Sequence, residues 1–191
     1  IPANRAIGYG PEITYVVIEV DCLGPDSLVP LAARLLLAQD RVDDFCKTTG
    51  ILEHRVLSTF PGTTLEGAIC AHPLRGEGYD FDVPMLPGEF VTTDAGTGLV
   101  HLAPSHGQDD FAVTRAYGIE VPELVRDDGT YAPQVPLFAG IHVFKAADPV
   151  CAALTEARER HVANGDAVAG LLARGSVVHS YPHSWRSRTP I

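Results

Sequence analysis

Residues 96–117, GTGLVHLAPSHGQDDFAVTRAY, place a glycine turn, a short apolar strand and a helix in immediate succession. Residues 99–103 form the predicted strand, which ends at Pro104 because proline has no amide hydrogen to donate to a neighbouring strand. Residues 108–117 form the predicted helix, which ends at Gly118. The stretch therefore brings polar side chains to the end of a strand and to the start of the next helix.

Histidine and aspartate side chains at this junction have both structural and functional interpretations. Asp109 and Asp110 fall in the first helical turn, where free amides and the helix dipole favour negative charge. Capping alone accounts for such residues, and a histidine such as His101 in a strand is usually packed in the core. A metal site that also uses His106 would have suitable ligand types. The sequence offers no histidine pair one helical turn apart and no second ligand group, so we predict no metal site.

The composition predicts one globular domain. The chain has 191 residues, of which 46% are hydrophobic and 20% are charged. No run of about 18 or more apolar residues occurs, so no membrane span is expected. The cysteines are scattered without a CxxC motif, which predicts free thiols and a reducing, cytoplasmic location. The formal net charge of −10 argues, by itself, against binding nucleic acid.

Short strands are predicted where apolar runs are bounded by glycine and proline. They are residues 13–20, 55–60, 65–72, 81–84, 89–92, 99–103, 141–144 and 176–180. Helices are predicted at residues 28–37, 41–49, 108–117, 148–161 and 171–174, with Asp148 as the cap of the fourth. Because strands and helices do not alternate regularly, we expect an α+β fold with a twisted β-barrel-like core and peripheral helices.

Three segments together resemble a known family. Residues 96–111, GTGLVHLAPSHGQDDF, resemble the signature of the editing domain inserted into class I aminoacyl-tRNA synthetases for branched aliphatic amino acids. Residues 1–20, IPANRAIGYGPEITYVVIEV, and residues 179–191, HSYPHSWRSRTPI, resemble the two ends of that insert in isoleucyl-tRNA synthetases. The resemblance covers essentially the whole chain and implies that residues 1–191 are a single editing domain (connective peptide 1) of a larger synthetase.

The implied reaction is hydrolysis of the ester that joins misattached valine to tRNA(Ile). One missing methylene is worth only ~1–3 kcal/mol, so a second, smaller pocket must remove the error, and these synthetases are themselves the standard example of this limit. The implied partners are the 3′ terminus of tRNA(Ile) carrying valine and the rest of the synthetase in cis. Because other domains would hold most of the tRNA, the negative charge of this domain is compatible with that role.

The resemblance assigns catalytic and substrate-binding roles to Asp110 and His101. Asp110 would pair with the α-ammonium group of the amino acid, and Asp109 would be a surface charge. His101 would crowd out isoleucine, although packing beneath the site is an equally valid interpretation. The remaining implied substrate-binding residues are Gly96, Thr97, Gly98, His106 and Asn4. Thr97 and His106 also have plain turn-forming interpretations.

No general base is evident, so the resemblance implies a positioned water, assisted by a ribose hydroxyl of the substrate. No cofactor is expected in this domain, since ATP and magnesium belong to the catalytic domain. Residues 184–187, SWRS, supply no thiolate for zinc. A monomer is expected. Two alternatives stay open: a fragment that binds without hydrolysing because the family's threonine-rich peptide is missing, and a valyl-type editing domain.

Overall fold

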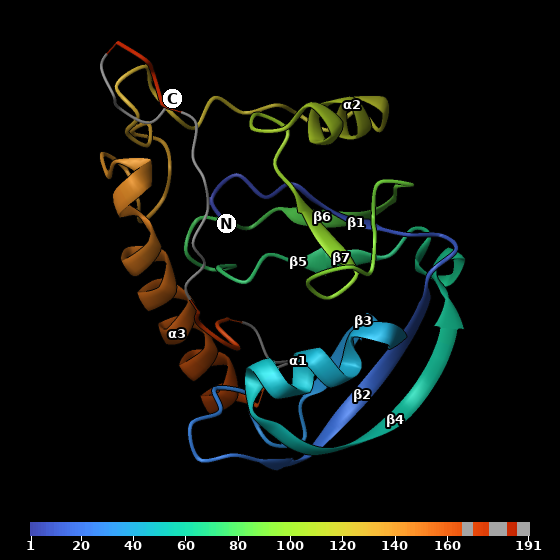
Figure 1. The fold of residues 1–191 in the computed structure, drawn as a ribbon. Helices are drawn as coiled ribbons and strands as arrows, with labels where there is room; N and C mark the ends of the chain where they lie inside the picture. The colour runs from blue at the N-terminus through green and yellow to red at the C-terminus, as the bar shows by residue number, and fades with distance from the viewer. Residues whose placement is uncertain (166–169, 176–182, 187–191) are drawn as a thin grey trace.

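The computed structural model describes residues 1–165, 170–175 and 183–186, arranged as two open sheets with helices packed around them (Figure 1). The first sheet has the strand order β5-β6-β1-β7 and contains β1 (Ala6–Tyr9), β5 (Ile69–Ala71), β6 (Asp82–Pro87) and β7 (Leu99–Leu102). The second has the order β3-β2-β4 and contains β2 (Thr14–Leu23), β3 (Arg34–Ala38) and β4 (Ile51–Pro61). The α-helices are α1 (Val42–Thr49), α2 (Gln108–Ala116) and α3 (Ala147–Asn164), with 3-10 helices η1 (Gln39–Arg41), η2 (Gly62–Leu65) and η3 (Val143–Lys145).

The first sheet joins the start of the chain to its central segment. β1 pairs in parallel with β6 and antiparallel with β7. The register places Ala6 opposite Leu102 and Ile7 opposite His101. Helix α2 packs on this sheet, with Val113 against the buried Leu102. Residues 1–5, which precede β1, therefore lie beside the end of β7 and the start of α2.

The second sheet buries one face against α1. Val16, Ile18 and Val20 alternate along β2, as expected of a strand with one face in the core. Helix α1 covers this face with Val42 and Cys46. It ends at Gly50, which adopts the left-handed conformation at the C-cap position (φ 73°) that glycine tolerates best. The predicted strand at residues 13–20 and helix at 41–49 are confirmed.

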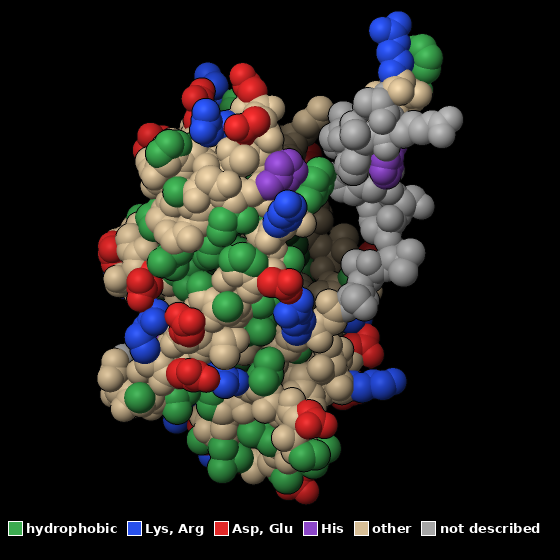
Figure 2. Space-filling model, turned by 90° about the vertical axis from the view of Figure 1, so that its left-hand side faces the viewer, with side chains coloured by type: hydrophobic (Ala, Val, Ile, Leu, Met, Phe, Trp, Pro, Cys, Tyr) green, Lys and Arg blue, Asp and Glu red, His purple; other side chains and the backbone are tan. Residues whose placement is uncertain are grey.

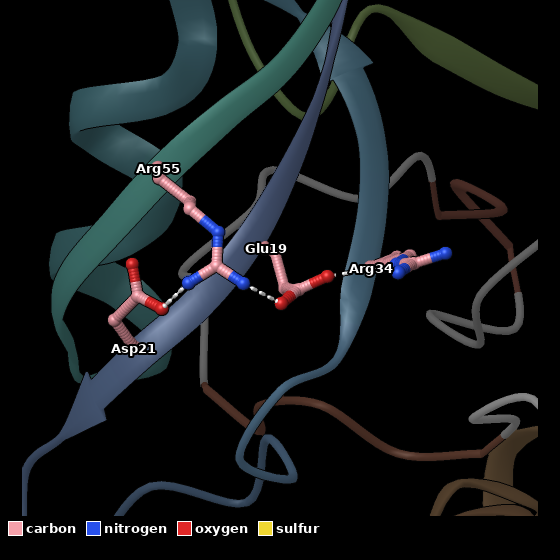
Figure 3. Close-up of polar contacts among 4 residues, drawn as sticks. All are labelled: Glu19, Asp21, Arg34 and Arg55. Carbon is pink, nitrogen blue, oxygen red and sulfur yellow. Dashed lines mark hydrogen bonds and ion pairs between the residues drawn. The ribbon is translucent and has the colours of Figure 1, made fainter.

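An ion-pair network occupies the outer face of the same sheet (Figure 3). Glu19 on β2 accepts a hydrogen bond from Arg34 Nε at 2.8 Å on one side and pairs with Arg55 on the other, and Arg55 also pairs with Asp21. The hydrogen bond from Arg34 is the main reason that the pKa of Glu19 is lowered. The Arg34 and Arg55 side chains are 72% and 56% exposed, whereas that of Glu19 is only 10% exposed. The two arginines therefore shield Glu19 from solvent.

Helix α3 runs along one side of the molecule past both sheets (Figure 1). Its Leu154 and Ala157 pack into a core with Leu74, Tyr79 and Phe138. The predicted helix at residues 148–161 is confirmed, but it begins earlier than expected. Ala146 is the N-cap and Asp148 lies in the first turn, so the predicted capping role of Asp148 is wrong.

The predicted helix at residues 28–37 is wrong, because part of it forms strand β3. Leu35 and Leu37 pair with Ile18 and Val16 of β2 and contact the core beneath α1. Ala32, just before the strand, has a φ of 59°, which a regular right-handed helix excludes. The gain from pairing and burial thus overrides the helical preference of the leucines.

Other short elements also differ from expectation. Residues 89–92 form no strand, and residues 171–174 form no helix. Residues 141–144 contain the start of η3 and only an isolated bridge between Thr130 and His142. The strand expected at residues 65–72 is confined to Ile69–Ala71. The strand expected at residues 176–180 lies outside the described residues.

The α+β class is confirmed, but the strands of the described residues do not close into a barrel. The two sheets meet where β3 ends, through a backbone hydrogen bond from Ala38 N to Thr97 O at 2.8 Å. Tyr9, Tyr15 and Met85 fill the core at this meeting point. Because, among the described residues, β5 pairs with β6 alone and β4 with β2 alone, both sheets have an unpaired edge in this part of the chain.

One buried histidine lies in the loop that follows β5. His72 is 1% exposed and stacks on Tyr79, with ring centroids 4.6 Å apart and an interplanar angle of 12°. Burial lowers the pKa of His72 from its usual 6.5 to about 4. The imidazole is therefore neutral at neutral pH.

This pKa predicts a pH dependence of stability. The unfolded chain binds the proton of His72 at a higher pH than the folded chain does, so the free energy of unfolding falls as the pH drops from 6.5 to 4. The loss from His72 is at most about 3 kcal/mol. Urea unfolding across this pH range should show the decline. His72→Gln, which cannot titrate, should show a shallower one, and an identical slope in both proteins would contradict the assignment.

Candidate functional site

The junction between β7 and α2 is held by Asp110. Gly107 is the N-cap of α2 in an extended conformation and supplies no side chain. The carboxylate of Asp110 instead accepts a hydrogen bond from the backbone N–H of Ala103, with Oδ2 at 2.8 Å. The buried Thr114 hydroxyl donates to the carbonyl oxygen of Asp110 at 2.5 Å. Asp110 therefore ties the helix start to the strand end, a structural duty beyond the helix dipole that its position alone indicates.

A cavity of about 440 Å³ opens beside this junction. It brings together three of the predicted site residues, His101, His106 and Asp110. The complete lining consists of Ile1, Pro2, Ala3, His101, Ala103, His106, Asp110, Val125, Tyr131 and Val143. A larger cavity of about 810 Å³ adjoins it and shares His106 and Val125, but it contains neither His101 nor Asp110. The smaller cavity is thus the candidate site, because it holds the carboxylate and both imidazoles.

His101 is a neutral group in this cavity. Its side chain is accessible through the open cavity, yet enough protein surrounds it for burial to lower its pKa, and the nearby Asp110 only partly opposes that shift. A neutral imidazole offers one N–H donor and one acceptor. Asp110 and His101 therefore present a carboxylate and a neutral hydrogen-bonding ring to the same space.

The Gly-Thr-Gly turn lies at the other end of β7 and does not line the cavity. The carbonyl oxygen of Thr97 accepts from Ala38 N at 2.8 Å, and that of Gly98 accepts from the Tyr15 hydroxyl at 2.6 Å. The turn thus joins the two sheets. The substrate-binding roles of Gly96, Thr97 and Gly98 stay predictions.

Asn4 follows the lining residues 1–3 in the chain but does not itself line the cavity. It is only 7% exposed, and its backbone N–H donates to the carbonyl oxygen of Ile1 at 3.1 Å. Its side-chain Oδ1 is buried and has no hydrogen-bond partner among the described residues. An acceptor in that state is costly, and the substrate-binding role of Asn4 stays a prediction.

Other chemistry has little support in the described part of the chain. No group of three His, Cys, Asp or Glu residues there could hold a metal ion. The Cys46 thiol lies 3.6 Å from His54 Nδ1, but burial raises its pKa, which disfavours the reactive thiolate. Among the same residues, no helix is both long and apolar enough to cross a membrane.

No family model matches the chain, but sequence relatives do. Over all 191 residues it is 69% identical to the isoleucine–tRNA ligase of Gluconobacter oxydans (strain 621H) and 40% identical to that of Pelagibacter ubique (strain HTCC1062). By sequence, the chain is a segment of the isoleucine–tRNA ligase family. It spans about a fifth of the length of these relatives, 20% and 19% respectively.

Two solved structures of leucyl enzymes are also similar to the ligase segment. The crystal structure of GlLeuRS-CP1 is 18% identical, with a TM-score of 0.45, and the match covers 90% of this chain and 70% of that one. The editing domain of the P. falciparum cytosolic leucyl-tRNA synthetase is 13% identical, with a TM-score of 0.42, over 58% of this chain and 41% of that one.

Part of the cavity wall in this ligase segment was not predicted. Val125 and Tyr131 form an isolated antiparallel bridge, and Val143 follows in η3. The one usable signal was the Asp-Asp-Gly turn at residues 127–129, because a turn of this kind brings its flanking residues opposite each other. Nothing in the sequence indicated that the resulting pair would face His101 and Asp110.

The Gly-Thr-Gly turn generates a stability prediction. Gly98 has a φ of 72°, and a Cβ there would lie 2.4 Å from the Cβ of Ala38. Gly98→Ala should therefore lower the free energy of unfolding by roughly 2–4 kcal/mol, through the left-handed conformation and the clash. Gly96→Ala is the matched control, since Gly96 has the same φ and nothing within 4 Å of the added atom.

Gly96→Ala should cost only about 1 kcal/mol. Urea unfolding of both variants of the 191-residue chain measures the difference. Equal losses would show that the close approach of the turn to β3 is unimportant for stability.

Proposed function

We propose that residues 1–191 form the editing domain of an isoleucine–tRNA ligase and hydrolyse the ester that joins misattached valine to tRNA(Ile). The observation that carries this proposal is the small cavity in which Asp110, His101 and His106 meet. The alignment of the whole chain with isoleucine–tRNA ligases supports it, because those enzymes must deal with valine.

Asp110 binds the α-ammonium group of the misattached amino acid. Its Oδ2 already accepts one hydrogen bond, from Ala103 N. A carboxylate has about four lone-pair sites, so it can accept from an ammonium group at the same time. Because the backbone holds the carboxylate in place, the ammonium meets a charge that is already oriented.

The walls around Asp110 favour a small aliphatic side chain. Ala103, Val125 and Val143 supply apolar surface, and His101 narrows the same space. Valine is accepted, and isoleucine, which is larger by one methylene, is crowded out. The cavity thus acts as the second, smaller sieve of a two-site discrimination.

Hydrolysis uses a water positioned against the ester carbonyl. Asp110 is occupied by the ammonium group, so it is not the base for that water. The low pKa of His101 keeps its ring neutral, which lets it accept a hydrogen bond from a water or from a ribose hydroxyl. The ester carbon is attacked by the water oxygen, and the ribose oxygen leaves with a proton. No cofactor is needed for this reaction, since ATP and magnesium serve the catalytic domain.

The tRNA is held mainly by the rest of the ligase in cis. On the face seen in Figure 2, acidic and basic side chains are interspersed over the described residues. The whole chain has a formal net charge of −10. Phosphate binding depends on clustered Lys and Arg side chains. This domain therefore receives only the terminal nucleotide and its amino acid.

The test of this proposal compares Asp110→Asn with Asp109→Asn in the full-length ligase. Asparagine keeps an oxygen that can accept from Ala103 N but removes the charge that would pair with the ammonium. Loss of a charge-assisted hydrogen bond of about 1.5–3 kcal/mol should slow deacylation of valyl-tRNA(Ile) roughly 10- to 100-fold. Asp109→Asn, in the same helical turn but outside the cavity, should deacylate normally.

Release of radiolabelled valine from charged tRNA(Ile) measures both variants. Normal hydrolysis by Asp110→Asn, or loss of hydrolysis in Asp109→Asn, would refute the assignment. Asp110→Ala should also lower the melting temperature, because it removes the hydrogen bond to Ala103. Failure of the wild-type ligase to release valine from valyl-tRNA(Ile) would instead indicate that this domain does not hydrolyse the ester.

A further inference from the structure

Residues 1–3 form part of the wall of the candidate cavity, which His106 and Asp110 also line. They belong to no helix or sheet, so regular backbone pairing does not fix them. Pairing with β7 begins only with the bond from Arg5 N to Leu102 O, at 2.9 Å. Side-chain packing and single hydrogen bonds must therefore position this wall, and a cavity that selects by size requires rigid sides.

His72 makes a long-range hydrogen bond to this wall. Its Nε2 lies 3.3 Å from the carbonyl oxygen of Ile1, and its Nδ1 accepts a hydrogen bond from Leu74 N at 3.1 Å. Because Nδ1 is the acceptor, the proton of the neutral ring is on Nε2, which donates to Ile1. The same carbonyl oxygen accepts from Asn4 N, so one buried histidine and one local turn share it.

The ring of His72 is itself immobilised. It stacks on Tyr79, whose hydroxyl donates to the carbonyl oxygen of Pro136 at 2.9 Å. Phe81 packs against both rings and carries the Arg5 guanidinium over its face, 4.3 Å from the ring centroid. Arg5 donates to the carbonyl oxygens of Pro2 and Asn4 at 3.1 and 2.8 Å. His72 and Arg5 thus donate hydrogen bonds to three backbone carbonyl oxygens of residues 1–4. Both side chains rest on the rings of Tyr79 and Phe81, which we call the aromatic base.

We propose that His72 is a positioning residue for the candidate site: its hydrogen bond to Ile1 fixes the wall formed by residues 1–3 and so sets the room available to the amino-acid side chain. This inference rests on the proposed editing function and adds a determinant of its specificity. His72 does not line the cavity, so it acts on the substrate only through the wall. Loosening the wall should admit isoleucine more readily than it changes the handling of valine.

Two substitutions separate this role from general stability. Both His72→Asn and His72→Gln remove the stacked ring. The asparagine oxygen replaces Nδ1 as acceptor for Leu74 N and leaves Ile1 without its donor, whereas the longer glutamine amide reaches Ile1 as a donor. Tyr79→Phe is the control for the aromatic base, since it loses the bond to Pro136 and keeps the ring.

The experiment measures release of valine and of isoleucine from separately charged tRNA(Ile) by each full-length ligase. His72→Asn should lower the ratio of valine release to isoleucine release about tenfold, the scale of one methylene, while His72→Gln and Tyr79→Phe stay within about twofold of the wild type. Melting temperatures should fall similarly for His72→Asn and His72→Gln.

An unchanged ratio in His72→Asn would overturn the proposal, because a purely structural residue would slow both releases in proportion. An equal fall in the ratio for His72→Gln would also overturn it, since stacking would then be responsible. If the wild type releases valine and Asp110→Asn does not, either of those results leaves the proposed function standing. If the wild type releases neither amino acid faster than uncatalysed loss, the proposed function fails, and the role of His72 fails with it.

Discussion

The antiparallel pairing of β1 with β7 is the constraint on which the candidate site depends. It places Ile7 opposite His101, so the first residues of the chain meet a segment about a hundred positions later. A contact of such sequence separation is entropically expensive to form and must be supported by burial on both sides. Helix α2 and the aromatic cluster beneath residues 1–5 provide that burial. The cavity exists because these two remote segments share one sheet.

Local signals in the sequence predicted the elements whose backbone hydrogen bonds form within the element itself. Helix α1 ends at Gly50, whose left-handed conformation depends on no distant partner. Helix α2 begins where Asp109 and Asp110 lie near the free backbone amides of the first turn. Strand β3 is the contrasting case. Its leucines favour a helix in isolation, and only the presence of β2 makes an extended chain the better way to bury them. Single-sequence reasoning has no access to that partner.

The same distinction applies to the candidate site. Asp110, His101 and His106 lie close in sequence, so their place around one cavity follows from the local motif. The bond from Ala103 to Asp110 follows from the exact geometry of the turn, and the wall that contains Tyr131 follows from packing of a loop. Most of the arginines whose contacts are described pair with acidic neighbours, as Arg34 and Arg55 do with Glu19. An arginine that is paired in this way is less available to bind a tRNA phosphate. A count of basic residues does not reveal this pairing.

The tether between Asp110 and Ala103 also has an entropic consequence. A free aspartate side chain samples several rotamers and loses that freedom when it captures a ligand, at a cost of about 0.5–1.5 kcal/mol for an immobilised side chain. Here the backbone of the preceding strand has already removed this freedom during folding. The penalty is therefore met once, when the chain folds, and not again with each ligand. A carboxylate that looks like a simple helix anchor is in this way already oriented for the ammonium group that we propose it binds.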